Sequence, residues 1–177
     1  MRSSRRAPIL ALVVATLLAG VPARAQAPRR AASPGPADAF VGTWALNLDK
    51  STYENQPAPK SGMRTLDYER DGMILVTVHT VSAAGATSFV HYLFTLDGKE
   101  YEEMARGAGP APSQTPTYVS ATQVSERAIN VVFKSGGKVT ISHEWSISED
   151  GKTYTAKRTA TNNQGQRVYS VQVYDKQ

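Results

Sequence analysis

The chain has 177 residues and no cysteine, a length that suits one domain with a short extension. The missing thiols exclude disulfides, cysteine nucleophiles, thiolate metal sites and a lipid anchor on an N-terminal cysteine. The formal charge of +5 arises ahead of the domain, because six of the 20 basic residues and one of the 15 acidic residues precede Phe40. Phe40–Gln177 therefore has 14 of each, which excludes the concentrated basic surface of a nucleic-acid-binding protein.

The start of the chain has the layout of a secretory signal peptide. A basic start is followed by an apolar run, Ile9–Leu18, and by the small-residue pattern Ala23-Arg24-Ala25. We therefore predict a signal peptide over residues 1–25 and a periplasmic or secreted location. Cleavage after Ala27 is the alternative, although it would place Pro28 directly after the cut bond. The apolar run is shorter than the about 20 residues that cross a bilayer, so we expect no membrane span.

Repeated strand-like runs follow a short linker. Residues 26–39 are rich in proline, alanine and small polar residues without an apolar period, which is typical of a flexible linker. From Phe40 onward, alternating or β-branched runs of about seven to ten residues end at turns. Pairs such as Asp71-Gly72 and Gly136-Gly137 mark these turns, since such residues accept the positive φ of tight hairpins. The predicted strands of the domain, residues 40–177, are Phe40–Leu48, Met63–Arg70, Met73–Val81, Thr87–Leu96, Lys99–Ala105, Thr117–Ser125, Ile129–Lys134, Lys138–Ser148, Thr153–Thr161 and Gln166–Asp175.

This succession of strands predicts how the domain closes. About ten antiparallel strands joined mostly by hairpins would leave two exposed edges, and closure into a barrel removes them. We therefore predict an all-β fold, a single antiparallel up-and-down β-barrel. Two longer connections, Asp49–Gly62 and Arg106–Pro116, are expected to form a lid or a rim.

The start of the domain carries a motif of one barrel superfamily. Gly42-Thr43-Trp44 resembles the Gly-x-Trp of lipocalins, and Gly42–Asn47 with Lys50-Ser51 is similar to the start of a group of exported bacterial lipocalin-like proteins of the calycin superfamily. The similarity extends to the hairpin Asp97–Tyr101 and to the closing segment Val171–Gln177. It implies a barrel like those of lipocalins and fatty-acid-binding proteins, closed at one end by Gly42 and Trp44, that binds a small hydrophobic molecule inside. Two features depart from those families: the later lipocalin motifs have no clear place, and no helical lid follows the first strand.

Five residues are candidates for the ligand-binding wall. In Lys138–Ser148 every second residue is apolar except His143, so His143 and Trp145 are predicted to face inward; the alternative is an ordinary core histidine with one hydrogen bond. Arg158 shares a face with Tyr154 and two alanines. A cation there is costly unless it stacks on the closing tryptophan, binds the acidic head of a ligand or reaches water. Tyr169 belongs to a similar alternating run and completes the set.

Other chemistry has little support in the sequence. His79 and His91 lie about equally far from the Ala84-Gly85 turn, so they are either cross-strand neighbours able to share a metal or two unrelated histidines. No nucleophile elbow, phosphate loop, dinucleotide fingerprint or zinc-protease motif is present. We therefore predict no metal, no cofactor and no catalytic residue.

Three functional hypotheses remain, in decreasing order of support. The first is an exported carrier or sensor for a small hydrophobic or amphipathic ligand. The second is an envelope structural or protein-interaction module, in which the apolar hairpin Met73–Leu96 forms a homodimer or partner interface. The third is a calycin-type enzyme that would rely on His143 and Arg158.

Overall fold

The computed structural model describes residues 35–107, 116–162 and 164–177, and all of them belong to one compact unit. The predicted signal peptide and most of the predicted linker lie outside the described residues. Eleven strands form one antiparallel sheet in the order β5-β7-β8-β9-β10-β11-β1-β2-β3-β4-β6. They are β1 (Gly42–Glu54), β2 (Ser61–Tyr68), β3 (Ile74–Val81), β4 (Thr87–Phe94), β5 (Tyr101–Glu102), β6 (Ala105–Gly107), β7 (Thr117–Ser125), β8 (Ala128–Ser135), β9 (Lys138–Ile147), β10 (Thr153–Thr161) and β11 (Arg167–Lys176).

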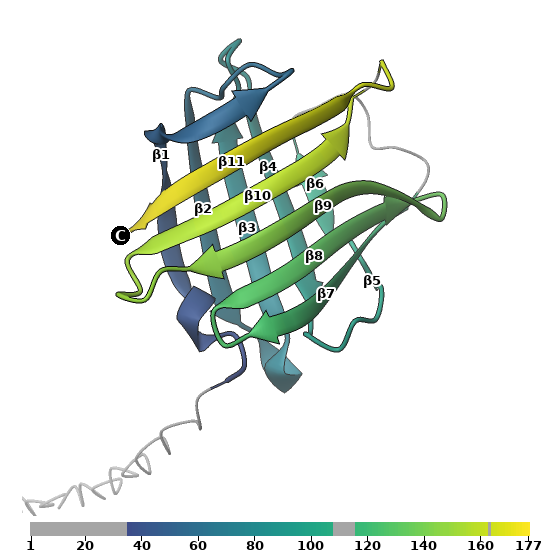
Figure 1. The fold of residues 1–177 in the computed structure, drawn as a ribbon. Coiled ribbons are helices and arrows are strands. Elements are labelled where there is room, and N and C mark those ends of the chain that lie inside the picture. Colours follow the sequence, from purple (N-terminus) through teal and green to yellow (C-terminus); the bar gives the residue numbers. More distant parts are fainter. Residues whose placement is uncertain (1–34, 108–115, 163) are drawn as a thin grey trace, which may run out of the picture. The chain divides into compact units, whose positions relative to one another are not determined.

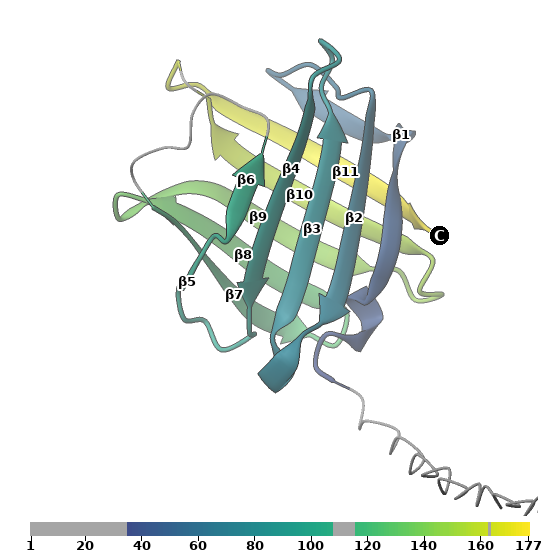
Figure 2. The same ribbon diagram turned by 180° about the vertical axis from the view of Figure 1, so that it is seen from behind.

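The sheet curls into a nearly closed barrel, which confirms the predicted fold class. β7 to β11 form one wall, and β2, β3, β4 and β6 form the opposite wall and cross behind it (Figures 1 and 2). β1 joins the walls, because it pairs with β2 over Gly42–Ala45 and with β11 from Trp44 onward. The first and last long strands of the domain are therefore neighbours, as closure of a meander requires.

The strand bounds agree with the prediction to within two residues except at two places. The predicted strand Lys99–Ala105 is divided, since Glu102 pairs with Tyr118 of β7 whereas Ala105 pairs with His91 of β4. The chain crosses from one edge of the sheet to the other within these few residues, so it cannot form one continuous strand. Part of the predicted loop Asp49–Gly62 is strand instead, because β1 runs on to Glu54.

A bulge lets β1 continue past its predicted end. The register with β11 shifts between Asn47 and Thr52, and side chains satisfy the backbone there. Ser51 Oγ donates to the Asn47 carbonyl at 2.6 Å, and the side-chain amide of Asn47 donates to Asp175 at 2.6 Å. Such bulges bend a strand while keeping its pairing, and this one carries β1 around the barrel to the far wall.

One end of the barrel is filled by aromatic side chains. Trp44 has no exposed surface and donates from Nε1 to the carbonyl of Phe40 at 2.9 Å. Phe40 ends a 3₁₀ helix, Asp38–Phe40, and is itself fully buried. The hydroxyl of Tyr68 accepts from the Ala37 amide at 2.9 Å, so packed structure begins before Phe40, within the predicted linker.

Gly42 stands at the start of β1 with a φ of 135°, a conformation that side chains rarely adopt. A Cβ at this position would meet Lys176, whose ammonium lies over the Trp44 ring at 5.2 Å. Gly42 and Trp44 thus lie together at the end of the barrel where the 3₁₀ helix packs. No helix among the described residues has the length and apolar character needed to span a membrane.

Candidate binding cavity

A cavity of about 360 Å³ opens inside the barrel, within the size range of small-molecule sites. Both walls contribute apolar and polar side chains to its lining in similar measure, and Pro57, Pro59 and the Ser82-Ala83 turn line its outer part. The outer residues include part of the predicted rim Asp49–Gly62. The second predicted rim, Arg106–Pro116, lies mostly outside the described residues. The apolar lining consists of Leu46, Val78, Val90, Phe133 and Ile141.

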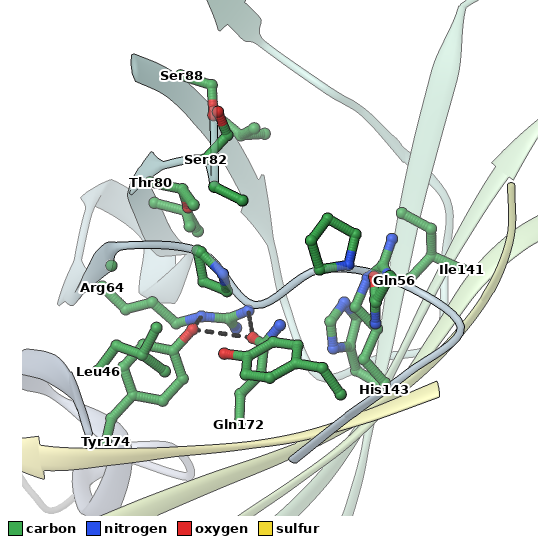
Figure 3. Close-up of a pocket in the computed structure, with 18 of the residues that line it drawn as sticks. Leu46, Gln56, Arg64, Thr80, Ser82, Ser88, Ile141, His143, Gln172 and Tyr174 are labelled. Carbon is green, nitrogen blue, oxygen red and sulfur yellow. Dashed lines mark hydrogen bonds between the residues drawn. The ribbon is translucent and has the colours of Figure 1, made fainter. Parts of the chain in front are cut away.

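Arg64 of β2 lines the cavity and is buried, with 5% of its surface exposed. Its Nη1 donates to the Tyr154 hydroxyl at 2.8 Å, and its Nε donates to the Tyr174 hydroxyl at 3.2 Å. Nη2 lies 3.5 Å from the side-chain oxygen of Gln172. Figure 3 shows the guanidinium beside Tyr174 and Gln172, across the cavity from His143.

Aromatic rings surround the same guanidinium. Its Cζ lies 5.4 Å from the ring centre of Trp145, 5.6 Å from Tyr154 and 5.2 Å from Tyr174, which are cation–π distances. Burial opposes the charged form, but the hydroxyls of Tyr154 and Tyr174 outweigh it, and the pKa of Arg64 lies above its usual value. Arg64 therefore stays charged at every physiological pH.

No carboxylate neutralises Arg64 within the described part of the chain. The ion pairs found among those residues, such as Lys50–Asp175 and Lys134–Glu100, lie on the surface, and none includes Arg64. A buried charge without an opposite charge is costly, even where neutral hydrogen bonds and rings surround it. The inner end of the cavity therefore favours an anion.

His143 of β9 is buried on the opposite wall, as predicted, and lines the cavity. Its ring lies 6.0 Å from those of both Phe133 and Trp145. Its Nδ1 is fully buried and has no hydrogen-bond partner among the described residues. Burial, and then the nearby charges of Arg64 and Arg158, hold the pKa of His143 well below 6.5, so the imidazole is neutral at pH 7.

The other predicted wall residues divide into three groups. Arg158 lines the cavity and donates to Gln56 at 3.4 Å. Trp145 and Tyr154 point inward but lie beneath the cavity, where they contact Arg64. Tyr169 corrects the prediction, because in β11 the alternate residues Val168 and Ser170 are buried and Tyr169 lies on the opposite face.

Sequence reasoning missed Arg64, Gln172 and Tyr174. The signal for Arg64 was present, since it alternates with Leu66 along β2, just as Arg158 alternates with alanines along β10. For Gln172 and Tyr174 the error lay in the register of β11. The inward face has Ser170 and Gln172 in mid-strand whereas the opposite face has Val171 and Val173, so alternation favoured the wrong face.

The two histidines proposed as a metal pair lie on the hairpin formed by β3 and β4. Their rings are 6.4 Å apart, His79 pairing with Phe89 and His91 with Thr77. His91 Nδ1 shares a hydrogen bond with the Thr77 hydroxyl at 3.1 Å. In the described part of the chain no group of three or more metal-ligating side chains assembles. The interface predicted for this hairpin stays a prediction.

Comparisons with known proteins bear on the fold. No known protein family matches the chain, and no curated protein matches its sequence. Among solved structures it is similar to the wild-type fluorescent protein UnaG, at 16% identity and a TM-score of 0.50, over 78% of this chain and 97% of UnaG. A structure of a UnaG point mutant gives the same identity and TM-score, over 79% of this chain and 97% of that one. The zebrafish ileal bile acid-binding protein complexed with cholic acid has 14% identity and a TM-score of 0.46, over 78% of this chain and 99% of that protein. At these identities the likeness to UnaG shows the fold alone, an antiparallel β-barrel.

Proposed function

We propose that this chain is an exported carrier or sensor that holds a small amphipathic acid inside its barrel. The observation that carries the proposal is the charged guanidinium of Arg64, buried at the inner end of a cavity with a mixed polar and apolar lining, without a carboxylate among the described residues. A carboxylate or similar anion would supply the missing charge through hydrogen bonds that are stronger than neutral ones. The apolar lining would cover the rest of the molecule.

The arrangement also gives the ligand a direction. Arg64 contacts the rings of Trp145 and Tyr154, and both of these rings contact Phe40 at the closed end. The acid would therefore enter first and lie deepest, with its apolar part extending toward Pro57 and Pro59. Export is part of the proposal and depends on the signal-peptide pattern in residues 1–25.

A matched pair of ligands tests the role of charge. Hexadecanoic acid and hexadecanol have the same tail, so their affinities, measured by titration calorimetry, isolate the contribution of the carboxylate. We expect the wild-type protein to prefer the acid by at least about 30-fold, which corresponds to about 2 kcal/mol for a desolvated charge pair. Arg64→Met should lose that preference and keep the affinity for the alcohol.

The control is Arg127→Met, because Arg127 is an exposed arginine in the β7–β8 turn, bonded to the Ser148 carbonyl. This variant should bind the acid as the wild type does. Equal affinity of the wild type for acid and alcohol would refute an acidic ligand. Native mass spectrometry of the protein from its own host then identifies the natural ligand by its mass.

A further inference from the structure

A row of polar side chains crosses the inner face of four neighbouring strands. His143 of β9 pairs with Arg158 of β10, Arg158 with Ser170 of β11, and Ser170 with Tyr53 of β1. Residues directly opposite each other in an antiparallel pair project to the same face. The buried His143 and Ser170 fix that face as the interior. Four neighbouring strands therefore place one polar residue each at the same level of the barrel.

Both ends of this row have unused hydrogen-bonding capacity. Nδ1 of His143 and the hydroxyl of Tyr53 are buried atoms without a hydrogen-bond partner among the described residues, and both side chains line the cavity. Ser51 lies close to the Tyr53 hydroxyl without forming a hydrogen bond of good geometry. Burial, the largest effect, raises the pKa of Tyr53 to about 12, so it keeps its proton. Buried polar atoms are nearly always paired in folded proteins, so two such atoms at one cavity indicate a missing partner.

From this row we infer that the cavity has a second recognition point, at His143 and Tyr53, for a hydroxyl or oxo group on the body of the bound acid. The inference rests on the proposed function and narrows its ligand to oxygenated amphipathic acids. A neutral imidazole has one donor and one acceptor nitrogen, and a phenol can donate or accept. The pair therefore matches a neutral oxygen group better than a second charge.

The position of the second point relative to Arg64 follows from one shared neighbour. The Trp145 ring contacts the Arg64 guanidinium at 5.4 Å and the His143 ring at 6.0 Å. A ligand whose acid meets Arg64 thus passes His143 within a few carbon atoms. The oxygen group is expected near the carboxylate or in the middle of the ligand, and not at its far end.

The test compares hexadecanoic acid with its monohydroxylated isomers, in which the hydroxyl stands near the carboxylate, at mid-chain or at the far end. We expect an isomer with its hydroxyl near the carboxylate or at mid-chain to bind the purified full chain about tenfold more tightly than hexadecanoic acid. This is the gain expected when a buried polar atom acquires a hydrogen-bond partner. His143→Leu should abolish this advantage of the hydroxylated acid over the parent acid. Tyr53→Phe removes a single oxygen atom, so it tests the same point with minimal change to packing.

His79→Leu is the matched control, because His79 is an exposed histidine that is absent from the cavity lining. It should keep the preference for the hydroxylated acid. Equal affinity of the wild type for all acids would overturn the second recognition point and leave the acid carrier intact, with water then satisfying His143 and Tyr53. A hydroxyl preference that survives both His143→Leu and Tyr53→Phe would also overturn it. Failure of every acid to bind would overturn the proposed function itself.

Discussion

Replacing Arg64 by methionine should separate the energy of folding from the energy of binding. Methionine keeps much of the side-chain length and its packing against the rings, but it removes the charge. The Tyr174 hydroxyl keeps its hydrogen bond to Gln172 at 2.9 Å, whereas the Tyr154 hydroxyl loses its donor. One unpaired buried hydroxyl costs about 1–3 kcal/mol, and the relieved desolvation of the guanidinium offsets that cost by a similar amount.

The free energy of unfolding of Arg64→Met should therefore lie within about 2 kcal/mol of the wild-type value. Breaking a buried ion pair costs about 3–5 kcal/mol because a charge is left behind, and no carboxylate among the described residues would be left behind here. Urea denaturation without ligand measures this difference. A loss above about 4 kcal/mol would show that Arg64 mainly holds the barrel together, and the reason to expect an anion would disappear.

The same denaturation with ligand measures the binding half of the prediction. At a free acid concentration of 100 times the dissociation constant, the wild type should gain about 2.7 kcal/mol. A roughly 30-fold loss of affinity in Arg64→Met would reduce the gain at that concentration to about 0.9 kcal/mol. Thermal scans should show the wild-type gain as a rise of about 5 to 11 °C in Tm. Equal gains in both proteins would contradict the placement of the acid at Arg64.

Three further changes test the fold and its titration. Trp44→Ala should lower the free energy of unfolding by about 3–5 kcal/mol, because it empties the fully buried space beside Phe40; a loss below about 1 kcal/mol in urea would contradict the closing role. Gly42→Ala should lower the free energy of unfolding by about 1–3 kcal/mol, because a φ of 135° strains any residue with a side chain. Urea denaturation at neutral pH measures this loss. His143 has a folded-state pKa well below 6.5, so the unfolded chain binds more protons and stability should fall as the pH drops below about 6.5. His143→Phe should flatten the decline between about pH 6.5 and 5, and an unchanged decline would show that other groups cause it.

The sequence predicted the barrel well because turn chemistry and alternation are local properties. Thr117–Ser125 and Thr153–Thr161 have the predicted bounds, and the second strand lies between Asp150-Gly151 and Asn162, residue types that stop a strand sharply. The division of Lys99–Ala105 could not be predicted, because it depends on which edges of the sheet lie nearby after closure. The alternation of polar and apolar residues along a strand holds no information about which sheet edges lie close together.

The candidate site was predicted only in part, for a different physical reason. His143 and Arg158 were identified because each is polar on an otherwise apolar face. Tyr169 was placed inside because its face of β11 also carries Val171 and Val173, and only pairing with β10 and β1 decides which face is inside. The partners of Arg64 come from strands β10 and β11, far along the chain. Their meeting is a product of barrel closure.

The charge distribution of the domain supports recognition from within. Phe40–Gln177 has no net charge, and the side chains of the ion pairs described on its surface are about one-third exposed or more, so salt screens them and their energy is small. The buried guanidinium of Arg64 lies in a medium of lower dielectric, where a single charge has a much larger effect. A neutral exterior does not attract anions in general. Discrimination between acidic and neutral ligands therefore has to occur inside the cavity. The neutral imidazole of His143 adds no further charge to the two arginines, Arg64 and Arg158, that line the cavity.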